Sequence, residues 1–292
     1  MEIQKSFQEK NDQGKFYVVP TPIGNLEDIT YRAIHILKTV DLIAAEDTRQ
    51  TQKLLNHFSI TTPLLSYHDH NKELKGEQLI GKMLSGQSIA IVSDAGMPVI
   101  SDPGYELVRQ CTEENIDIVV LPGANAALCA LVGSGLPSDQ FYFYGFLPRK
   151  KSKIQETLEE LKKQRATLLF YESPHRIKET VKQIQTIFGD DRSIVLAREL
   201  TKKYEEFVRG TVKEVSDWLR STDSVIKGEY CIVVEGSQKV EKDNAWWEDM
   251  SVSEHVDYYV NVKKLSSKDA IKQTAKDRTV PKREVYAIYH KT

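Results

Sequence analysis

Apolar runs of strand length alternate with helical patterns along the first half of this chain. The strand-like runs cover residues 16–19, 42–45, 64–65, 88–92 and 116–121. The helical patterns that follow them lie near 30–38, 49–57, 73–85, after Pro103 and from about Ala124. Strands that alternate with helices predict parallel pairing in a doubly wound α/β sheet.

The same alternation resumes after a break at Gly133-Ser134-Gly135-Leu136-Pro137-Ser138, and glycine and proline at this density indicate a domain boundary. The later strand-like runs cover 141–144, 167–171, 194–197 and 230–234. They predict a second α/β domain. Residues 204–209 could add one antiparallel strand to it.

Several helix starts can be read from their cap residues. Thr211 with Glu214 matches a capping box. Asp102-Pro103 and Ser173-Pro174 are each typical of an N-cap followed by proline at the first helical position. For Asp102 taken alone we therefore favour a structural role.

The last part of the chain is polar, helical in pattern and basic. Lysine and arginine occur nine times from Lys263 to Thr292, against three acidic residues, which gives this segment about six net positive charges. It can be a solvated helical surface or an appendage that binds phosphate. The expected division is a flexible N-terminus at 1–15, α/β domains at 16–136 and 137–238, and a small helical region at 239–292.

Composition excludes several classes of protein. The 292 residues carry a formal net charge of −2, so the chain is no uniformly basic nucleic-acid binder, although a local basic patch stays possible. No apolar run is long enough for a membrane span, and the N-terminus lacks the apolar core of a signal peptide. Three scattered cysteines without metal spacing fit a reducing cytoplasm and predict no metal site.

Three rigid loops follow strands of the first predicted sheet: Pro20–Asp28, Ser93–Gly104 and Pro122–Ala127. Open α/β sheets bind ligands at the carboxyl ends of their strands. The first loop has a single glycine and two prolines, which disfavours dinucleotide and triphosphate cofactors. Polar anchors beside apolar residues predict instead a pocket for an adenosine-bearing ligand, formed by Ile23, Asp94, Val99, Ile100, Ser101 and Asn125.

Charged residues follow other strands and allow two interpretations. In Glu46-Asp47-Thr48-Arg49 they can cap a helix and form an ion pair, or they can orient a substrate beside a carboxylate base. In the second domain, four cations follow strand ends and would give the crevice at these strand ends a positive edge suited to a polyanion. Each cation alone is more often a surface group. These cations are Arg176, Arg198, Lys202 and Lys203.

Taken together, the motifs resemble the bacterial methyltransferases that modify a cytidine 2′-hydroxyl in 16S ribosomal RNA, within the tetrapyrrole methylase superfamily. The resemblance covers about residues 15–236 and rests on Pro20–Asn25, Glu46–Arg49, Ser93–Gly104, Pro122–Ala127, Glu172–Arg176 and Arg198–Lys202. It implies two α/β domains with a cleft between them, plus a small C-terminal helical extension. It also implies S-adenosylmethionine as the cofactor, a homodimer, and the 30S ribosomal subunit as partner.

Roles follow from the resemblance by position. The cofactor residues would be Pro22, Ile23, Asp94, Gly96, Val99, Ile100, Ser101, Asn125, Ala126, Tyr171 and Glu229. RNA would contact Arg49, Arg176, Arg198, Lys202, Lys282 and Arg283. A ribose hydroxyl needs a base, for which the candidates are Glu46, Asp47 and Glu199, in that order.

Two other functions stay open from the sequence. A methylase of the same fold could act on a small tetrapyrrole, but such a substrate needs neither Glu46–Arg49 nor the basic tail. A non-catalytic RNA-binding assembly factor would not require rigid loops at several strand ends. Binding of S-adenosylmethionine and methylation of 30S subunits distinguish the three.

Overall fold

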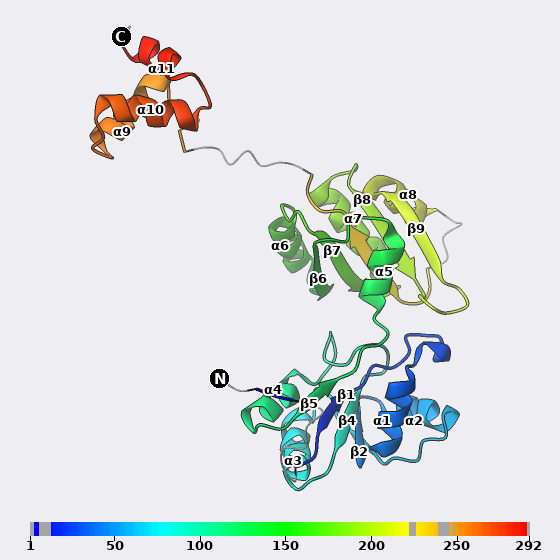
Figure 1. Cartoon of the computed structure of the whole chain (residues 1–292). Coiled ribbons are helices and arrows are strands. Elements are labelled where there is room, and N and C mark those ends of the chain that lie inside the picture. Colours follow the sequence, from blue (N-terminus) through cyan, green and yellow to red (C-terminus); the bar gives the residue numbers. More distant parts are fainter. Residues whose placement is uncertain (1–2, 6–12, 222–225, 239–245, 248, 291–292) are drawn as a thin grey trace. The chain divides into compact units, whose positions relative to one another are not determined.

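A computed structural model describes residues 3–5, 13–221, 226–238, 246–247 and 249–290 of the chain (Figure 1). The chain divides into two compact units, Met1–Ser237 and Gln238–Thr292. Much of the N-terminus that we expected to be flexible lies outside the described residues. Gln4, which lies within them, exchanges two hydrogen bonds with the backbone of Ile118, at 2.7 and 3.0 Å.

The first sheet of the larger unit is entirely parallel, as predicted. Its strands lie in the order β3-β2-β4-β1-β5. Their bounds are Phe16–Val18 (β1), Leu42–Ala45 (β2), Leu64–Ser66 (β3), Ile89–Val92 (β4) and Ile118–Val120 (β5). The carboxyl ends of all five strands therefore face one edge, where the loops flagged in the sequence emerge.

Helices cover both faces of this sheet, so it is doubly wound. Leu37 and Leu55 pack with Ile43 on one face, whereas Leu79 and Leu107 pack on the other. The helices are α1 (Tyr31–Thr39), α2 (Thr48–His57), α3 (Lys72–Leu84) and α4 (Tyr105–Glu113), with a short 3-10 turn at Leu26–Asp28. In Figure 1, α1 and α2 lie on one side of the strands and α3 and α4 on the other.

The second sheet is mixed, whereas the first is parallel throughout. Only β6 and β7 are parallel, while β10 pairs antiparallel with both β7 and β8. Every residue of β10 is buried, and a strand covered on both faces shows the same apolar run in either direction. The antiparallel strand expected near 204–209 is confirmed as β9, paired with β8. The order is β6 (Phe141–Phe146), β7 (Thr167–Glu172), β10 (Tyr230–Val234), β8 (Ser193–Arg198), β9 (Glu206–Thr211).

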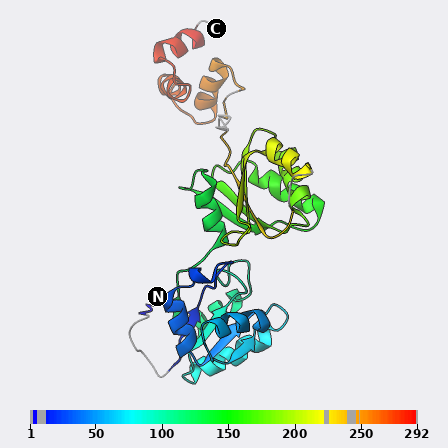
Figure 2. The ribbon, with the colours of Figure 1, turned by 90° about the vertical axis from the view of Figure 1, so that its right-hand side faces the viewer.

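Helices also cover both faces of the second sheet (Figure 2). One face carries α6 (Lys151–Leu161), α7 (Ile177–Phe188) and α8 (Val212–Arg220). The other carries α5 (Ala126–Ser134), whose Ala130 and Leu131 pack against Val195 and Val233. The sequence division assigns α5 to the first α/β domain, yet the helix packs on the second sheet. Gly135, with a left-handed φ of 78°, forms its C-cap, so the glycine-rich break ends this helix.

The C-terminal unit is helical, as expected, and has its own core. It contains α9 (Val252–Asn261), α10 (Ser267–Asp277) and α11 (Lys282–Tyr289), which enclose Val256, Ile271 and Val285. The guanidinium of Arg278 donates to the carbonyls of Met250 and Ser251 and so fixes the segment before α9. Within the described part of the chain, no helix combines the length and apolar character needed to span a bilayer.

Two of the expected helix starts are wrong. Helix α4 begins at Tyr105 after Gly104, which adopts a φ of 135° and makes no side-chain cap, so Asp102 is not an N-cap. Helix α7 begins at Ile177, beyond a turn that replaces the expected start at Ser173-Pro174. By contrast, the capping box of Thr211 with Glu214 is confirmed. The correction frees the Asp102 carboxyl for another role.

Candidate functional site

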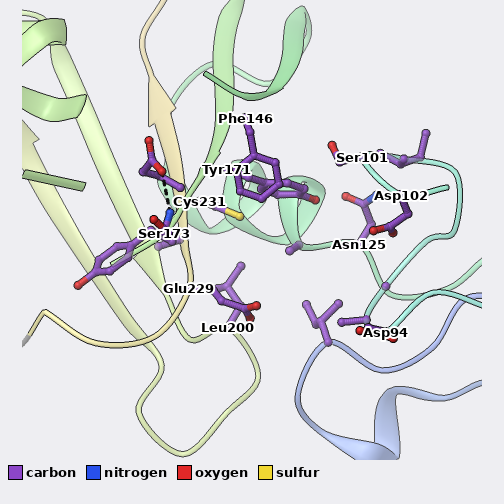
Figure 3. Close-up of a pocket in the computed structure, with 18 of the residues that line it drawn as sticks. Asp94, Ser101, Asp102, Asn125, Phe146, Tyr171, Ser173, Leu200, Glu229 and Cys231 are labelled. Carbon is purple, nitrogen blue, oxygen red and sulfur yellow. Dashed lines mark hydrogen bonds between the residues drawn. The ribbon is translucent and has the colours of Figure 1, made fainter. Parts of the chain in front are cut away.

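A cavity of about 430 Å³ lies within the larger unit, where loops of the first sheet meet residues of the second (Figure 3). Its lining comes from the ends of β1, β2, β4, β6, β7 and β8, the start of α5 and the segment entering β10. The lining consists of Ile23, Glu46, residues 94–97 and 100–102, Asn125, Ala126, Phe146, residues 171–174, Ala197, Glu199, Leu200, Lys202 and residues 229–231. The strand-end loops thus gather at one site.

Backbone contacts hold the loops on the first-sheet side in place. Thr21 and Gly96 exchange N–H···O bonds of 2.9 and 3.0 Å, and the Thr21 hydroxyl donates to the Ser93 carbonyl. Val99 and Ser101 adopt left-handed φ values of 74° and 64°. Such values are rare for side chains with a Cβ, and most of all for a β-branched residue. The surrounding structure therefore fixes this loop in a strained shape, a condition common at functional sites.

The loop after β8 reaches back to the first loop. The backbone N–H of Asn25 donates to the Thr201 hydroxyl at 3.0 Å. Gly24 lies so close to Lys202 that a Cβ added there would come within 2.4 Å of the lysine Cγ. Glu199 and Thr201 also adopt left-handed φ values, of 49° and 65°. Glycine at position 24 is needed for this close approach.

Three polar side chains are oriented by backbone N–H groups at the cavity. The Asp94 carboxylate accepts from the Asp47 N–H at 3.1 Å. Asn125 caps α5 through its side-chain oxygen Oδ1, which leaves its side-chain NH₂ group as a donor. The Tyr171 hydroxyl accepts from the Ala127 N–H at 3.3 Å, and burial raises the pKa of Tyr171. Tyr171 thus keeps its proton and can donate it to a ligand.

Asp102 is the functional candidate that the sequence reasoning missed. Its carboxyl lines the cavity and makes no helix cap. Burial, and then the negative charge of Glu46, raise the pKa of Asp102 to about 7. Burial and the charge of Asp94 also raise the pKa of Glu46. The sequence signal that could have found Asp102 is its position in the same glycine- and proline-rich loop as Asp94.

The other two candidate bases are held in ionised form by hydrogen bonds. Asp47 caps α2, does not line the cavity, and has a pKa lowered to about 2 by hydrogen bonds from Arg49. Glu199 accepts from Lys202 Nζ at 2.9 Å and from the Glu229 N–H at 3.0 Å. Although burial acts in the opposite direction, these bonds lower the pKa of Glu199. Glu46 is the candidate base with a raised pKa.

The expected cofactor residues line the cavity with two exceptions, Pro22 and Val99. Val99 packs instead against the core on the α3 side of the first sheet. Its side chain also lies against Gly104, where a Cβ would meet Val99 Cγ2 at 2.9 Å. Pro22 lines a neighbouring cavity. Among the described residues, no group of three or more His, Cys, Asp or Glu side chains is arranged to hold a metal ion.

The expected RNA-binding cations occupy very different environments. Arg49 is exposed, with its side chain paired to Asp47 at 2.8 Å. Arg176 turns inward and donates to the carbonyls of Leu147 and Pro148 at 3.1 and 2.8 Å. Its guanidinium also lies 3.5 Å from the buried Glu172. Arg176 therefore joins segments of the second sheet.

The remaining expected cations divide in the same way. Arg198 is buried and pairs with Glu206 at 3.0 Å. Lys202 lines the cavity between Glu199 and Glu229. In the C-terminal unit, Lys282 and Arg283 are exposed in the first turn of α11. These last two are thus accessible to a polyanion.

Comparisons with known proteins identify relatives along the whole chain. The family model for tetrapyrrole (corrin/porphyrin) methylases matches residues 15–216. The chain is 55% identical to ribosomal RNA small subunit methyltransferase I of Halalkalibacterium halodurans over 291 residues, covering 99% of both chains. The protein of the same name from Bacillus subtilis is also 55% identical, covering 98% of both chains.

Solved structures share the fold at lower identity. A cobalt precorrin-4 methyltransferase of cobalamin biosynthesis aligns with a TM-score of 0.58 and 20% identity, over 76% of this chain and 94% of its own. Uroporphyrin-III C-methyl transferase of Thermus thermophilus, complexed with S-adenyl homocysteine, aligns with a TM-score of 0.52 and 18% identity, over 75% and 97%. The two-sheet architecture is therefore that of these methylases.

Proposed function

Since this chain belongs to the tetrapyrrole (corrin/porphyrin) methylase family and is a methyltransferase, we propose that it methylates the 2′-hydroxyl of a cytidine in the decoding region of 16S ribosomal RNA. The observation that carries the proposal is identity of 55% along almost the whole length of relatives named for methylation of small-subunit ribosomal RNA. The cytidine and its 2′-oxygen come from the motif resemblance. The proposed setting is the cytoplasm, where ribosomal subunits are found.

The cavity fits S-adenosylmethionine, the methyl donor of this family. Its volume of about 430 Å³ lies within the range of small-molecule pockets, roughly 300–1,000 Å³. Ile23, Ile100 and Leu200 supply apolar wall, and Asn125 and Tyr171 supply donors. The cavity has six carboxylate-bearing residues and one lysine, a balance that favours a cationic ligand. When bound, S-adenosylmethionine supplies a methyl group already activated on a sulfonium.

Asp94 and Gly96 are the central residues of the proposed donor site. The Asp94 side chain is held by the Asp47 N–H and can accept from a hydroxyl or ammonium group of the ligand. A Cβ at Gly96 would come within 3.1 Å of Ile23, so a larger residue would narrow the cavity there. Ala126 also has a small side chain, which lets a ligand approach the backbone at the start of α5.

Glu46 is the proposed general base. In the reaction the ribose oxygen bonds to the methyl carbon, the carbon–sulfur bond breaks with its electron pair staying on sulfur, and the hydroxyl proton passes to Glu46. A carboxylate with a raised pKa accepts a proton more readily at neutral pH than the ionised Asp47 or Glu199. The pKa of Asp102 is raised to about 7 by burial and by the charge of Glu46, so below neutral pH Asp102 holds a proton while Glu46 is ionised, because two like charges disfavour double ionisation.

An exposed apolar surface supports the proposed homodimer. Val132 on α5 is 79% exposed, and Leu128 on the same helix is 47% exposed. Phe141 and Tyr142 on the edge strand β6 are also exposed. Large apolar side chains on α5 and on a sheet edge are typical of a surface covered by another chain. Light scattering of the purified protein should therefore give a mass of two chains, and a monomer mass would contradict this part of the proposal.

Methylation of isolated 30S subunits tests the proposed function directly. Subunits from cells lacking the protein, incubated with it and radiolabelled S-adenosylmethionine, should gain one 2′-O-methyl group on a cytidine, located by mass mapping. Glu46→Gln should lower kcat by about a hundredfold or more while donor affinity persists, because the base is lost and the carboxamide is of equal size. Methylation of a porphyrin, with none of the RNA, would favour the small-molecule alternative. Donor binding without either product would leave the RNA assignment unsupported.

A further inference from the structure

A second cavity, of about 450 Å³, adjoins the first. It is formed by the loop after β1, the first half of α2, the loop after β4 and two residues of the second-sheet side. Its lining consists of residues 21–24, Leu26, Gln50, Thr51, Lys53, Leu54, Ser93, Asp94, Ala95, Lys202 and Glu229. Five of these also line the first cavity, namely Ile23, Asp94, Ala95, Lys202 and Glu229. The two cavities thus share a wall; Figure 3 shows Asp94 and Glu229 in the first.

The two cavities differ in charge. The first is acidic, because Glu46, Asp102, Glu172 and Glu199 line it in addition to the shared residues. The second lacks these four carboxylates and gains Lys53 from α2. A cationic ligand is therefore favoured in the first cavity. In the second cavity Lys53 and Lys202 balance Asp94 and Glu229, and Lys202 is already paired, so an anionic group is favoured there only beside Lys53.

Among the described residues, no carboxylate forms an ion pair with Lys53. Its Nζ donates to Gln50 Oε1 at 3.0 Å. By contrast, Lys202 pairs with two carboxylates and Arg49 pairs with Asp47. Lys53 is exposed at the mouth of the second cavity, where a phosphate group could reach it.

We propose that the second cavity is the acceptor site, which receives one unstacked pyrimidine nucleotide of RNA. The nucleotide phosphate contacts Lys53, the base edge contacts the Gln50 amide, and Leu26 and Leu54 form the apolar wall. The ribose then lies at the wall shared with the donor cavity, beside Asp94. Proteins recognise RNA sequence chiefly through such splayed-out nucleotides. The inference rests on the proposed function and names the residues of its substrate site.

Substitutions at Lys53 and Gln50 test the acceptor site. Both side chains are exposed, so Lys53→Ala and Gln50→Ala should leave the fold intact. The chain offers a matched control on α3, where Lys75 Nζ donates to Gln78 Oε1 at the same distance of 3.0 Å but neither residue lines the first or the second cavity. The assay is methylation of 30S subunits at several salt concentrations, with donor affinity from calorimetry.

Lys53→Ala should raise KM for 30S subunits roughly tenfold, since hydrogen bonds to charged groups are among the strong ones. It should also reduce the slope of log affinity against log salt by about one, because one phosphate contact is lost. Gln50→Ala should raise KM and leave the slope unchanged, since the amide carries no charge. Donor affinity should stay constant in both variants, and Lys75→Ala and Gln78→Ala should match the wild type.

Unchanged KM in both cavity variants, with an active wild type, would overturn the acceptor site and leave the proposed function standing. Weaker donor binding in Lys53→Ala would also overturn it, because it would place the donor in the second cavity. A wild-type protein that binds no donor and methylates no 30S subunit would instead refute the proposed function, and the acceptor site would fall with it.

Discussion

Replacement of Asp102 by asparagine should stabilise the protein at alkaline pH and change its stability little at acid pH. Asparagine has the size of aspartic acid and carries no charge at any pH. In the folded protein, burial and the charge of Glu46 disfavour the ionised form of Asp102. The folded state therefore holds a proton that the unfolded chain releases at lower pH, and this difference weakens folding as pH rises.

The size of the effect follows from the two pKa values. The pKa of Asp102 is raised from 3.8 to about 7, which is about three tenfold steps in proton affinity. At roughly 1.4 kcal/mol a step, the upper limit is roughly 4 kcal/mol. Because the Asp102 side chain is partly exposed to solvent, screening reduces this, and we expect about 1–2 kcal/mol. The gain should develop between about pH 4 and pH 7 and stay constant above.

Calorimetric unfolding at about pH 4 and about pH 8 measures the effect. Asp102→Asn should raise Tm by roughly 4 °C at the higher pH and by much less at the lower. Asp139→Asn, at an exposed position, is the control for loss of one negative charge. A stabilisation that is equal at the two pH values would refute the reasoning. Methylation near neutral pH should persist in Asp102→Asn, whereas its loss would transfer the role of base from Glu46 to Asp102.

Three further predictions concern other parts of the molecule. Asp94→Ala should weaken donor binding about tenfold or more in calorimetry, and unchanged affinity would remove Asp94 from the donor site. Arg176→Ala should lower the free energy of unfolding by roughly 2–4 kcal/mol in urea titrations, because it leaves a buried carboxylate without its cation, and KM for RNA should not change. Joint replacement of Lys282 and Arg283 by alanine should flatten the salt dependence of RNA binding by a slope of about two. If that slope is unaltered, α11 has only a structural role.

The first sheet could be predicted closely because its strands are short apolar runs and its helices show helical hydrophobic patterns in the sequence. Strand β4, Ile89–Val92, is buried throughout and lies between a glycine turn and a rigid loop, so it could be read as a central parallel strand. The direction of β10 could not be read in this way. Tyr230–Val234 is equally apolar and equally buried, yet it runs antiparallel to its neighbours. Burial on both faces requires an apolar strand whichever way it runs. Its direction is set by the segments that connect it to the neighbouring strands.

The candidate site could be predicted only in part. Its loops are recognisable from short sequence segments, whereas its charge interactions join residues that are far apart in the sequence. Gly96, Ser101 and Asn125 lie in segments whose glycine and proline content marks them at once, and all three line the cavity. The pKa of Asp102 depends on Glu46, which is 56 positions earlier in the chain and follows a different strand. No pattern within one loop could show that pairing.

The environment of the cations could not be predicted from the sequence either. Arg49 and Arg176 each follow a strand and open a helix, and in the sequence they look alike. The Arg49 side chain pairs with its neighbour Asp47 and stays exposed. The Arg176 side chain donates to the carbonyls of Leu147 and Pro148, which lie 29 and 28 positions earlier. Whether a cation is available for RNA is thus decided by the acceptors that the fold brings to it. For this reason Lys53, which lacks a carboxylate partner among the described residues, is a stronger candidate for an RNA contact than Arg176, which the sequence motif favoured.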